Sequence, residues 1–119
     1  MAHRILLVDD ETALRSLLGR ALRLEDYEVI EAADGFEAWA LARETRFDLI
    51  ITDNRMPRLN GPAFISRVQD RYPTLPILRL SGSQGESEDT VSGVTTLHKP
   101  FEIDALLDVV RSVLANQKL

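Results

Sequence analysis

The segment FDLIITDNRMP, residues 47–57, decides the fold class because it combines a short apolar run with an acid at its end. The run Leu49–Ile51 shows no polar alternation, which is typical of a strand covered on both faces. Asp53 follows directly, and Met56-Pro57 prevents the strand from continuing. A carboxylate at the tip of an apolar strand is costly unless something binds it. The segment therefore predicts a buried strand that delivers a functional acid.

Four other short runs rich in Ile, Leu or Val are expected to form strands, with helical patterns between them. The expected strands are Arg4–Val8, Tyr27–Glu31, Asp48–Thr52, Pro76–Leu80 and Val94–His98. The apolar stripes of the expected helices are Leu14, Leu17, Leu18, Ala21 and Leu22; Phe36, Trp39, Ala40 and Arg43; Phe64, Ile65 and Val68; and Ile103, Leu106, Leu107, Val110, Val113 and Leu114. This alternation predicts right-handed crossovers and an α/β, doubly wound, five-stranded parallel sheet with helices on both faces.

Composition narrows the function. The chain has 119 residues, which predicts one domain over residues 1–119. It contains no cysteine, so disulfides, thiol nucleophiles and thiolate metal sites are excluded. The net charge of −5 argues against nucleic acid as the direct partner. No apolar stretch reaches the length of a signal peptide or a membrane span, so we expect a cytoplasmic protein.

Polar side chains stand where the expected strands end. Asp9 and Asp10 follow the first strand, Asp53 the third, Ser81 the fourth and Lys99 the fifth. In an open parallel sheet, ligands bind outside the carboxyl ends of the strands, at the switch point of the strand order. We therefore expect three carboxylates, a hydroxyl and an ammonium to meet at one edge, with the first and third strands as central neighbours.

This set of groups fits phosphoryl chemistry. Clustered carboxylates repel one another, and a bound cation or a lysine offsets the repulsion. Oxygen ligands in a shallow, hydrated site favour Mg²⁺. A cation, the Lys99 ammonium and the Ser81 hydroxyl would balance charge on phosphoryl oxygens. Asp53 would then be the nucleophile that forms an acyl phosphate.

The chain resembles the receiver (CheY-like) domain of two-component response regulators over nearly its whole length. Each of the matching motifs alone would be weak evidence, whereas their order and spacing together are highly specific. They are LLVDDE (Leu6–Glu11), Asp34-Gly35 with Glu37-Ala38, DLIITDNRMP (Asp48–Pro57), NGPAF (Asn60–Phe64), LSG (Leu80–Gly82) and HKPF (His98–Phe101).

The resemblance implies a flavodoxin-like (βα)5 fold with strand order 2-1-3-4-5. It implies that Asp53 accepts phosphate from a phosphohistidine on a histidine kinase or a phosphotransfer protein. Asp9, Asp10, Asp53 and the backbone carbonyl of Arg55 would hold Mg²⁺.

The same resemblance implies that Lys99 and Ser81 contact the phosphoryl oxygens, and that the Lys99–Pro100 peptide bond is cis. Such a module catalyses only its own phosphorylation and dephosphorylation and is not a metabolic enzyme. It would switch a downstream output, either through another domain of the same polypeptide or as the receiver of a hybrid kinase.

Two features depart from the family pattern. Receivers usually carry Phe or Tyr three positions before the lysine, and this chain has Thr96 there. The crossover over residues 81–93 is short, so the fourth helix of the family is expected to be shortened to about one turn. Arg79, inside an otherwise apolar strand, is also unexpected.

Two alternative functions stay open from the sequence. A pseudo-receiver would keep the fold as a protein-binding module without being phosphorylated. The presence of the acids, Ser81 and Lys99 argues against this alternative, whereas Thr96 and the short crossover keep it open. A metal-dependent phosphohydrolase would also use an aspartyl phosphate, but Asp53-Asn54-Arg55 lacks a second acid two positions after the nucleophile. Uptake of phosphate from acetyl phosphate distinguishes these cases.

Overall fold

The computed structural model describes residues 2–55, 58–82 and 92–116. Its elements in chain order are β1 (Arg4–Val8), α1 (Thr12–Leu24), β2 (Glu28–Ala32), α2 (Gly35–Glu44), β3 (Leu49–Asp53), α3 (Gly61–Arg71), β4 (Ile77–Ser81), β5 (Val94–His98) and α4 (Ile103–Ala115). Among the described residues, no helix is long and apolar enough to cross a membrane.

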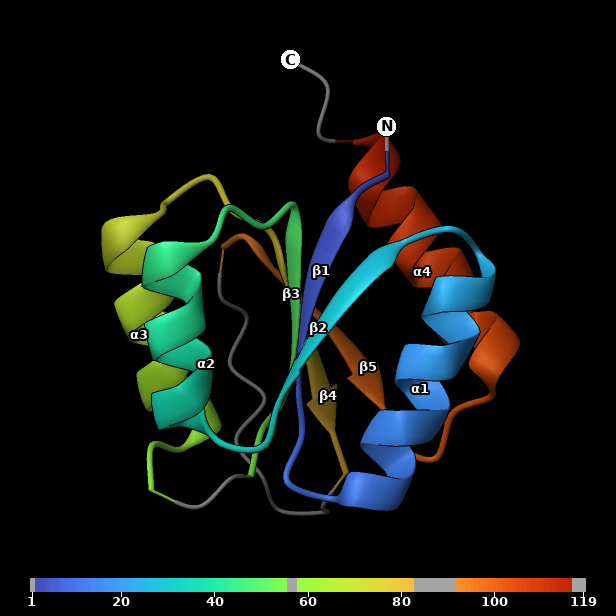
Figure 1. Cartoon of the computed structure of the whole chain (residues 1–119), viewed down its shortest axis with the longest axis horizontal. Coiled ribbons are helices and arrows are strands. Elements are labelled where there is room, and N and C mark those ends of the chain that lie inside the picture. Colours follow the sequence, from blue (N-terminus) through green and yellow to red (C-terminus); the bar gives the residue numbers. More distant parts are fainter. Residues whose placement is uncertain (1, 56–57, 83–91, 117–119) are drawn as a thin grey trace.

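The five strands form one parallel sheet with the order β2-β1-β3-β4-β5, which confirms the predicted fold and strand order. Helices α2 and α3 cover one face of the sheet, and α1 and α4 cover the other (Figure 1). Each face has its own apolar core, because successive strand residues point to opposite sides. The shortened helix expected within residues 81–93 falls mainly on residues outside the described ranges.

Three strands are displaced from their expected positions by one residue toward the C-terminus. They are β2, β3 and β4, and backbone hydrogen bonds to neighbouring segments explain the displacement. The Asp9 N–H donates to the carbonyl of Ala32 (3.1 Å), and the Lys99 N–H donates to the carbonyl of Ser81 (2.7 Å). Asp53 and Ser81 are consequently the last residues of β3 and β4 and are held by the sheet itself.

The apolar stripe expected for α2 is only partly the face that packs against the protein, where Trp39 is half-buried against the core. Phe36, which belongs to that stripe, is 47% exposed, and the buried residues are Gly35, Ala38 and Ala42. Small side chains are buried here because α2 lies close to α3 and to the sheet. In α1, Leu17 was expected on the inner face but is 53% exposed.

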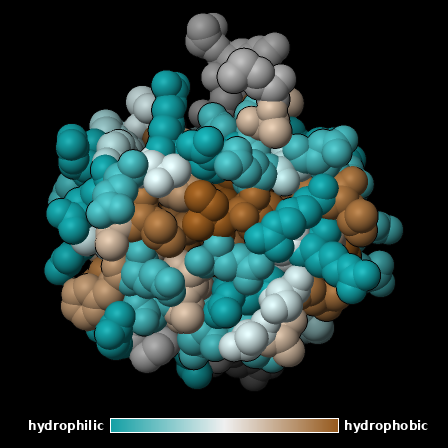
Figure 2. Space-filling model, viewed as in Figure 1, coloured by the Kyte–Doolittle hydropathy of each residue, from teal (hydrophilic) through white to brown (hydrophobic). Residues whose placement is uncertain are grey.

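Strand β2 lies at one edge of the sheet, in front of the other strands in the view of Figure 1. On this side, hydrophobic surface forms a band across the middle of the molecule, bordered by hydrophilic residues (Figure 2). The guanidinium of Arg23 donates to the carbonyl of Val29 in β2 (2.9 Å). This contact occupies an edge acceptor that another strand would otherwise pair with.

Candidate functional site

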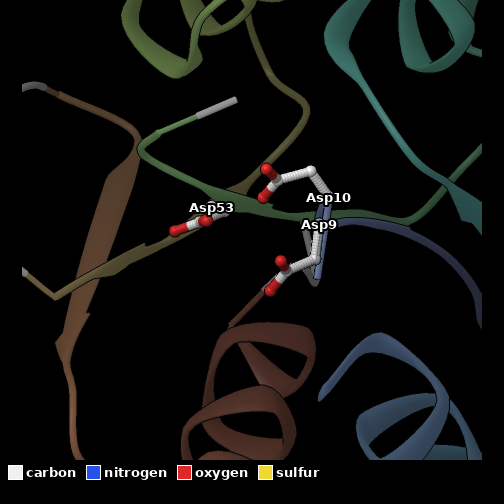
Figure 3. A group of neighbouring side chains, drawn as sticks. All are labelled: Asp9, Asp10 and Asp53. Carbon is white, nitrogen blue, oxygen red and sulfur yellow. The ribbon is translucent and has the colours of Figure 1, made fainter. Parts of the chain in front are cut away.

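Three carboxylates gather at the carboxyl ends of the two central strands. Asp9 and Asp10 follow β1, Asp53 ends β3, and one oxygen of each lies within 4.8 Å of the others. Figure 3 shows the three side chains around a common space between the strand ends. Asp9 is fully buried and Asp53 is 8% exposed, whereas Asp10 is exposed. The predicted convergence of these acids at the switch point is therefore present in the fold.

Asp9 has one satisfied and one unsatisfied carboxylate oxygen. Its Oδ1 accepts the backbone N–H of Glu11 (2.9 Å), whereas its Oδ2 is buried with no hydrogen-bond partner. The guanidinium of Arg15 donates to the backbone carbonyl of Asp9 (2.7 Å) and so fixes the start of α1 against the end of β1. Burial raises the pKa of the Asp9 carboxyl, and the neighbouring Asp53 acts in the same direction.

Asp53 is held by a strand-end amide and by the lysine. Its Oδ1 accepts the backbone N–H of Asn54 (2.9 Å) and the ammonium of Lys99 (3.3 Å). Burial raises the pKa of Asp53, while the charge and hydrogen bond of Lys99 oppose that effect. The structure thus brings together the carboxylate and the ammonium that are 46 residues apart in the chain.

Lys99 reaches Asp53 from the end of β5. The Lys99–Pro100 peptide bond is cis, as the resemblance implied. The lysine stem passes over Gly82, where a Cβ atom would lie 2.9 Å from the Lys99 Cδ. A side chain at position 82 would therefore compete with the lysine for this space.

Ser81 ends β4 and is 3% exposed. In the pairing of β3 with β4, Asp53 stands opposite Leu80, so Ser81 lies one residue further toward the acidic edge. Arg55 lies two residues beyond Asp53 and is exposed. The roles of the Ser81 hydroxyl and of the Arg55 carbonyl remain predictions.

The residues at this edge fit a hard divalent cation. All three candidate ligands are carboxylates, and the unpartnered Oδ2 of Asp9 is a buried acceptor that a cation would satisfy. A cation would also offset the repulsion among Asp9, Asp10 and Asp53. Asp9, Asp10 and Asp53 are thus the side chains that would hold Mg²⁺, and the predicted fourth ligand is the backbone carbonyl of Arg55.

One contact in this region was not predicted from the sequence. Arg79 in β4 is 8% exposed, and its Nε and Nη2 donate to the Thr96 hydroxyl of β5 at 3.1 and 2.9 Å. Arg79 and Thr96 stand directly opposite each other in the pairing of these strands. The two residues that looked most unusual in the sequence are therefore partners, and only the strand register reveals it.

A flavodoxin-like sheet with acids at the carboxyl ends of β1 and β3 is the architecture of a CheY-like domain. The family model of the response regulator receiver domain matches residues 5–111, so the chain belongs to the response regulator receiver family.

Known relatives agree with this assignment. The chain is 37% identical over 124 residues to the response regulator MprA of Mycobacterium ulcerans, covering all of this chain and 53% of that protein. Among solved structures, the chemotaxis protein CheY4 of Vibrio cholerae aligns with a TM-score of 0.85 at 35% identity, covering 95% of this chain and 99% of CheY4. The receiver domain of the hybrid histidine kinase CckA aligns with a TM-score of 0.81 at 39% identity, covering 93% and 98% of the two chains. The chain spans about half the length of the MprA proteins that it matches.

Proposed function

We propose that this chain is a phosphoacceptor module in which Asp53 takes a phosphoryl group from a phosphohistidine, in a reaction that depends on Mg²⁺. The observation that carries the proposal is the contact between the Lys99 ammonium and Asp53 (3.3 Å), beside two further carboxylates within 4.8 Å. In the proposal, Asp53 is the nucleophile, Lys99 is the cationic donor, and the neighbouring carboxylates are ligands of the cation. This arrangement supports phosphoryl transfer better than a purely structural role.

In the proposed step, a carboxylate oxygen of Asp53 forms a bond to phosphorus while the P–N bond of the donor breaks. The electron pair of that bond stays on the imidazole nitrogen, and the product is an acyl phosphate. Lys99 and Ser81 are proposed to donate hydrogen bonds to the phosphoryl oxygens. Bound Mg²⁺ would supply charge neutralisation at the same oxygens, held by Asp9, Asp10, Asp53 and the Arg55 carbonyl.

Intact mass after incubation with Mg²⁺ and acetyl phosphate tests the proposal. We expect a gain of one phosphoryl group that is lost in Asp53→Asn and when Mg²⁺ is omitted. Failure to form an adduct with acetyl phosphate or with a phosphorylated histidine donor would instead identify a pseudo-receiver that acts by binding alone. Multiple turnover of phosphate esters would point to a phosphohydrolase.

The proposed partner is a histidine kinase or a phosphotransfer protein in the cytoplasm. The match to response regulators and to the receiver of a hybrid kinase supports this class of partner. Because the chain covers only about half of its MprA relatives, we propose that the phosphorylated module controls an output domain or a hybrid kinase of a longer polypeptide.

A further inference from the structure

A hollow of about 690 Å³ lies at the end of the sheet where the strands begin, whereas the acidic site lies where the strands end. It is lined by residues 42–48, residues 71–76 and His3. These segments are the C-terminal ends of α2 and α3 and the loops that connect α2 to β3 and α3 to β4. Both helices run from the acidic end of the sheet to this one (Figure 1). A volume of this size is within the range of about 300–1,000 Å³ that small ligands occupy in proteins.

Three exposed guanidinium groups surround the hollow, from Arg43, Arg46 and Arg71. Within the described ranges, none of the three side chains makes an ion pair or a side-chain hydrogen bond. Arg20 and Arg67 also lack such contacts, whereas every other described arginine has an ion pair, a hydrogen bond or another polar interaction. Unpaired guanidinium groups are therefore concentrated at this one place.

Two of these groups lie over aromatic rings. The Cζ of Arg43 lies 5.7 Å from the ring centroid of Trp39, and the Cζ of Arg71 lies 5.2 Å from that of Tyr72. A guanidinium that rests on a ring keeps its N–H donors in the plane of the group, where they can bind oxygen atoms. The ring contacts of Arg43 and Arg71 therefore leave their N–H donors able to bind an anionic ligand.

A simpler explanation is that the arginines only balance the carboxyl ends of α2 and α3. Each helix end corresponds to about half a negative charge, so two ends account for about one of the three positive charges. Glu44 and Asp48 also line the hollow. The Oδ2 of Asp48 accepts the backbone N–H of Arg4 (2.7 Å), so that carboxylate is already engaged with the start of β1. Glu44, Asp48 and the two helix ends together carry about as much negative charge as the three arginines carry positive charge. Within the described residues, however, neither acid forms an ion pair with any of the three guanidinium groups, so their N–H donors stay available to an anion in the hollow.

We propose that this hollow binds a small ligand with closely spaced anionic oxygens, such as a pyrophosphate group, either free or as part of a nucleotide. The guanidinium fork matches two oxygens of a phosphate or a carboxylate. Thr45 and Thr74, which also line the hollow, add hydroxyl donors. The site is separate from Asp53 and does not depend on the function proposed for that residue.

Amide chemical shifts of the ¹⁵N-labelled protein in Mg²⁺-free buffer test this proposal. Pyrophosphate, ADP and citrate are titrated separately, so that phosphate and carboxylate ligands are distinguished. We expect saturable shifts of amides in residues 42–48 and 71–76 with pyrophosphate and ADP. The triple variant Arg43→Gln, Arg46→Gln, Arg71→Gln should weaken binding by about tenfold or more, since each charge-assisted contact is lost.

The matched control is the double variant Arg20→Gln, Arg67→Gln, which removes two equally unpaired guanidinium groups away from the hollow. It should retain the affinity of the unmodified protein. Saturable binding of citrate at the same amides would extend the ligand class to polycarboxylates and support the site. The proposal is wrong if none of these ligands shifts the amides at ligand concentrations up to about 10 mM, since a Kd above that concentration corresponds to very weak binding. An equal loss of binding in the triple and control variants would also overturn it, because it would show a general charge effect.

Discussion

Asp9 is the residue whose surroundings fit a bound cation most closely. Its carboxylate is fully buried, one oxygen has no hydrogen-bond partner, and burial raises its pKa. An acid with a raised pKa binds protons at a higher pH in the folded chain than in the unfolded chain. Its ionised form therefore opposes folding when no cation is present, and that effect disappears as the pH falls toward the ordinary value of about 3.9.

The variant Asp9→Asn should consequently stabilise the metal-free protein near pH 7, by on the order of 1–2 kcal/mol, because it removes a buried charge but keeps an acceptor for the Glu11 N–H. The difference from the unmodified protein should shrink between the raised pKa of Asp9 and about pH 4. Urea denaturation over a pH series measures this. A stability difference that does not change with pH would contradict the explanation.

Thr96 provides a second test at the scale of a residue. The variant Thr96→Val keeps the shape of the side chain but removes the acceptor of two Arg79 N–H groups. Losing two hydrogen bonds from a buried guanidinium should cost about 1–3 kcal/mol of the free energy of unfolding. Thr95→Val is the control, because Thr95 is exposed on the other side of β5 and should change the stability little. Equal effects of the two variants in urea denaturation would rule out a stabilising role for the Arg79–Thr96 contact.

The sequence identified the acids and Lys99 because all of them follow apolar strands, and parallel strands bring their carboxyl ends to one edge. The Arg79–Thr96 contact could not be predicted in the same way. It depends on the register between β4 and β5, which places Arg79 opposite Thr96 and which neither residue specifies alone. The contact of Arg15 with the Asp9 carbonyl likewise depends on how α1 lies against β1.

At the scale of elements, the order of strands and helices was predictable, whereas helix faces and strand ends were less so. The stripe of α2 was predicted from the spacing of its large side chains, but the fully buried residues of this helix are Gly35, Ala38 and Ala42. Close packing selects small residues, which a periodicity of large apolar residues does not detect. The ends of β2, β3 and β4 were displaced because pairing with neighbouring segments, rather than local composition, determines where a strand stops.

Gly61 shows how closely one helix approaches the site. It begins α3, and a Cβ atom there would lie 2.7 Å from the carbonyl oxygen of Asn54 and 2.8 Å from that of Asp53. Gly61→Ala should therefore destabilise the protein by about 1–3 kcal/mol and displace the end of β3, which slows phosphoryl uptake by Asp53.

Gly19→Ala is the matched control for Gly61→Ala, since Gly19 is also a buried helical glycine. Its added Cβ would meet the side-chain ends of Glu31 (2.8 Å) and Arg23 (3.3 Å), which can move more easily than backbone. We expect a smaller loss of stability and an unchanged rate of phosphoryl uptake. Thermal unfolding and the rate of adduct formation distinguish the two variants. A larger loss in Gly19→Ala would refute this view of the contact between α3 and β3.

At the scale of the whole molecule, the fold separates charge along the direction of the strands. Asp9, Asp10 and Asp53 lie where the central strands end, and the hollow with Arg43, Arg46 and Arg71, which Glu44 and Asp48 also line, lies where the strands begin. The alternating crossovers bring every β-to-α connection to the first end of the sheet and every α-to-β connection to the second. The chain as a whole has a net charge of −5. The acids gather at one end of the sheet because they lie in β-to-α connections, and the three arginines gather at the other because they lie at or near α-to-β connections.

Because the acidic edge draws its ligands from β1 and β3, cation binding should stabilise the whole sheet and not only one loop. Mg²⁺ at about one hundred times its Kd should add about 2.7 kcal/mol to the free energy of unfolding. That corresponds to an increase in Tm on the order of 10 °C. Thermal unfolding at constant ionic strength, with NaCl in place of MgCl₂ as reference, measures it. Asp9→Asn should lose most of this increase and Thr95→Val should keep it, since only Asp9 is a proposed ligand. An equal increase in Asp9→Asn would place the binding of Mg²⁺ elsewhere and exclude Asp9 as its ligand.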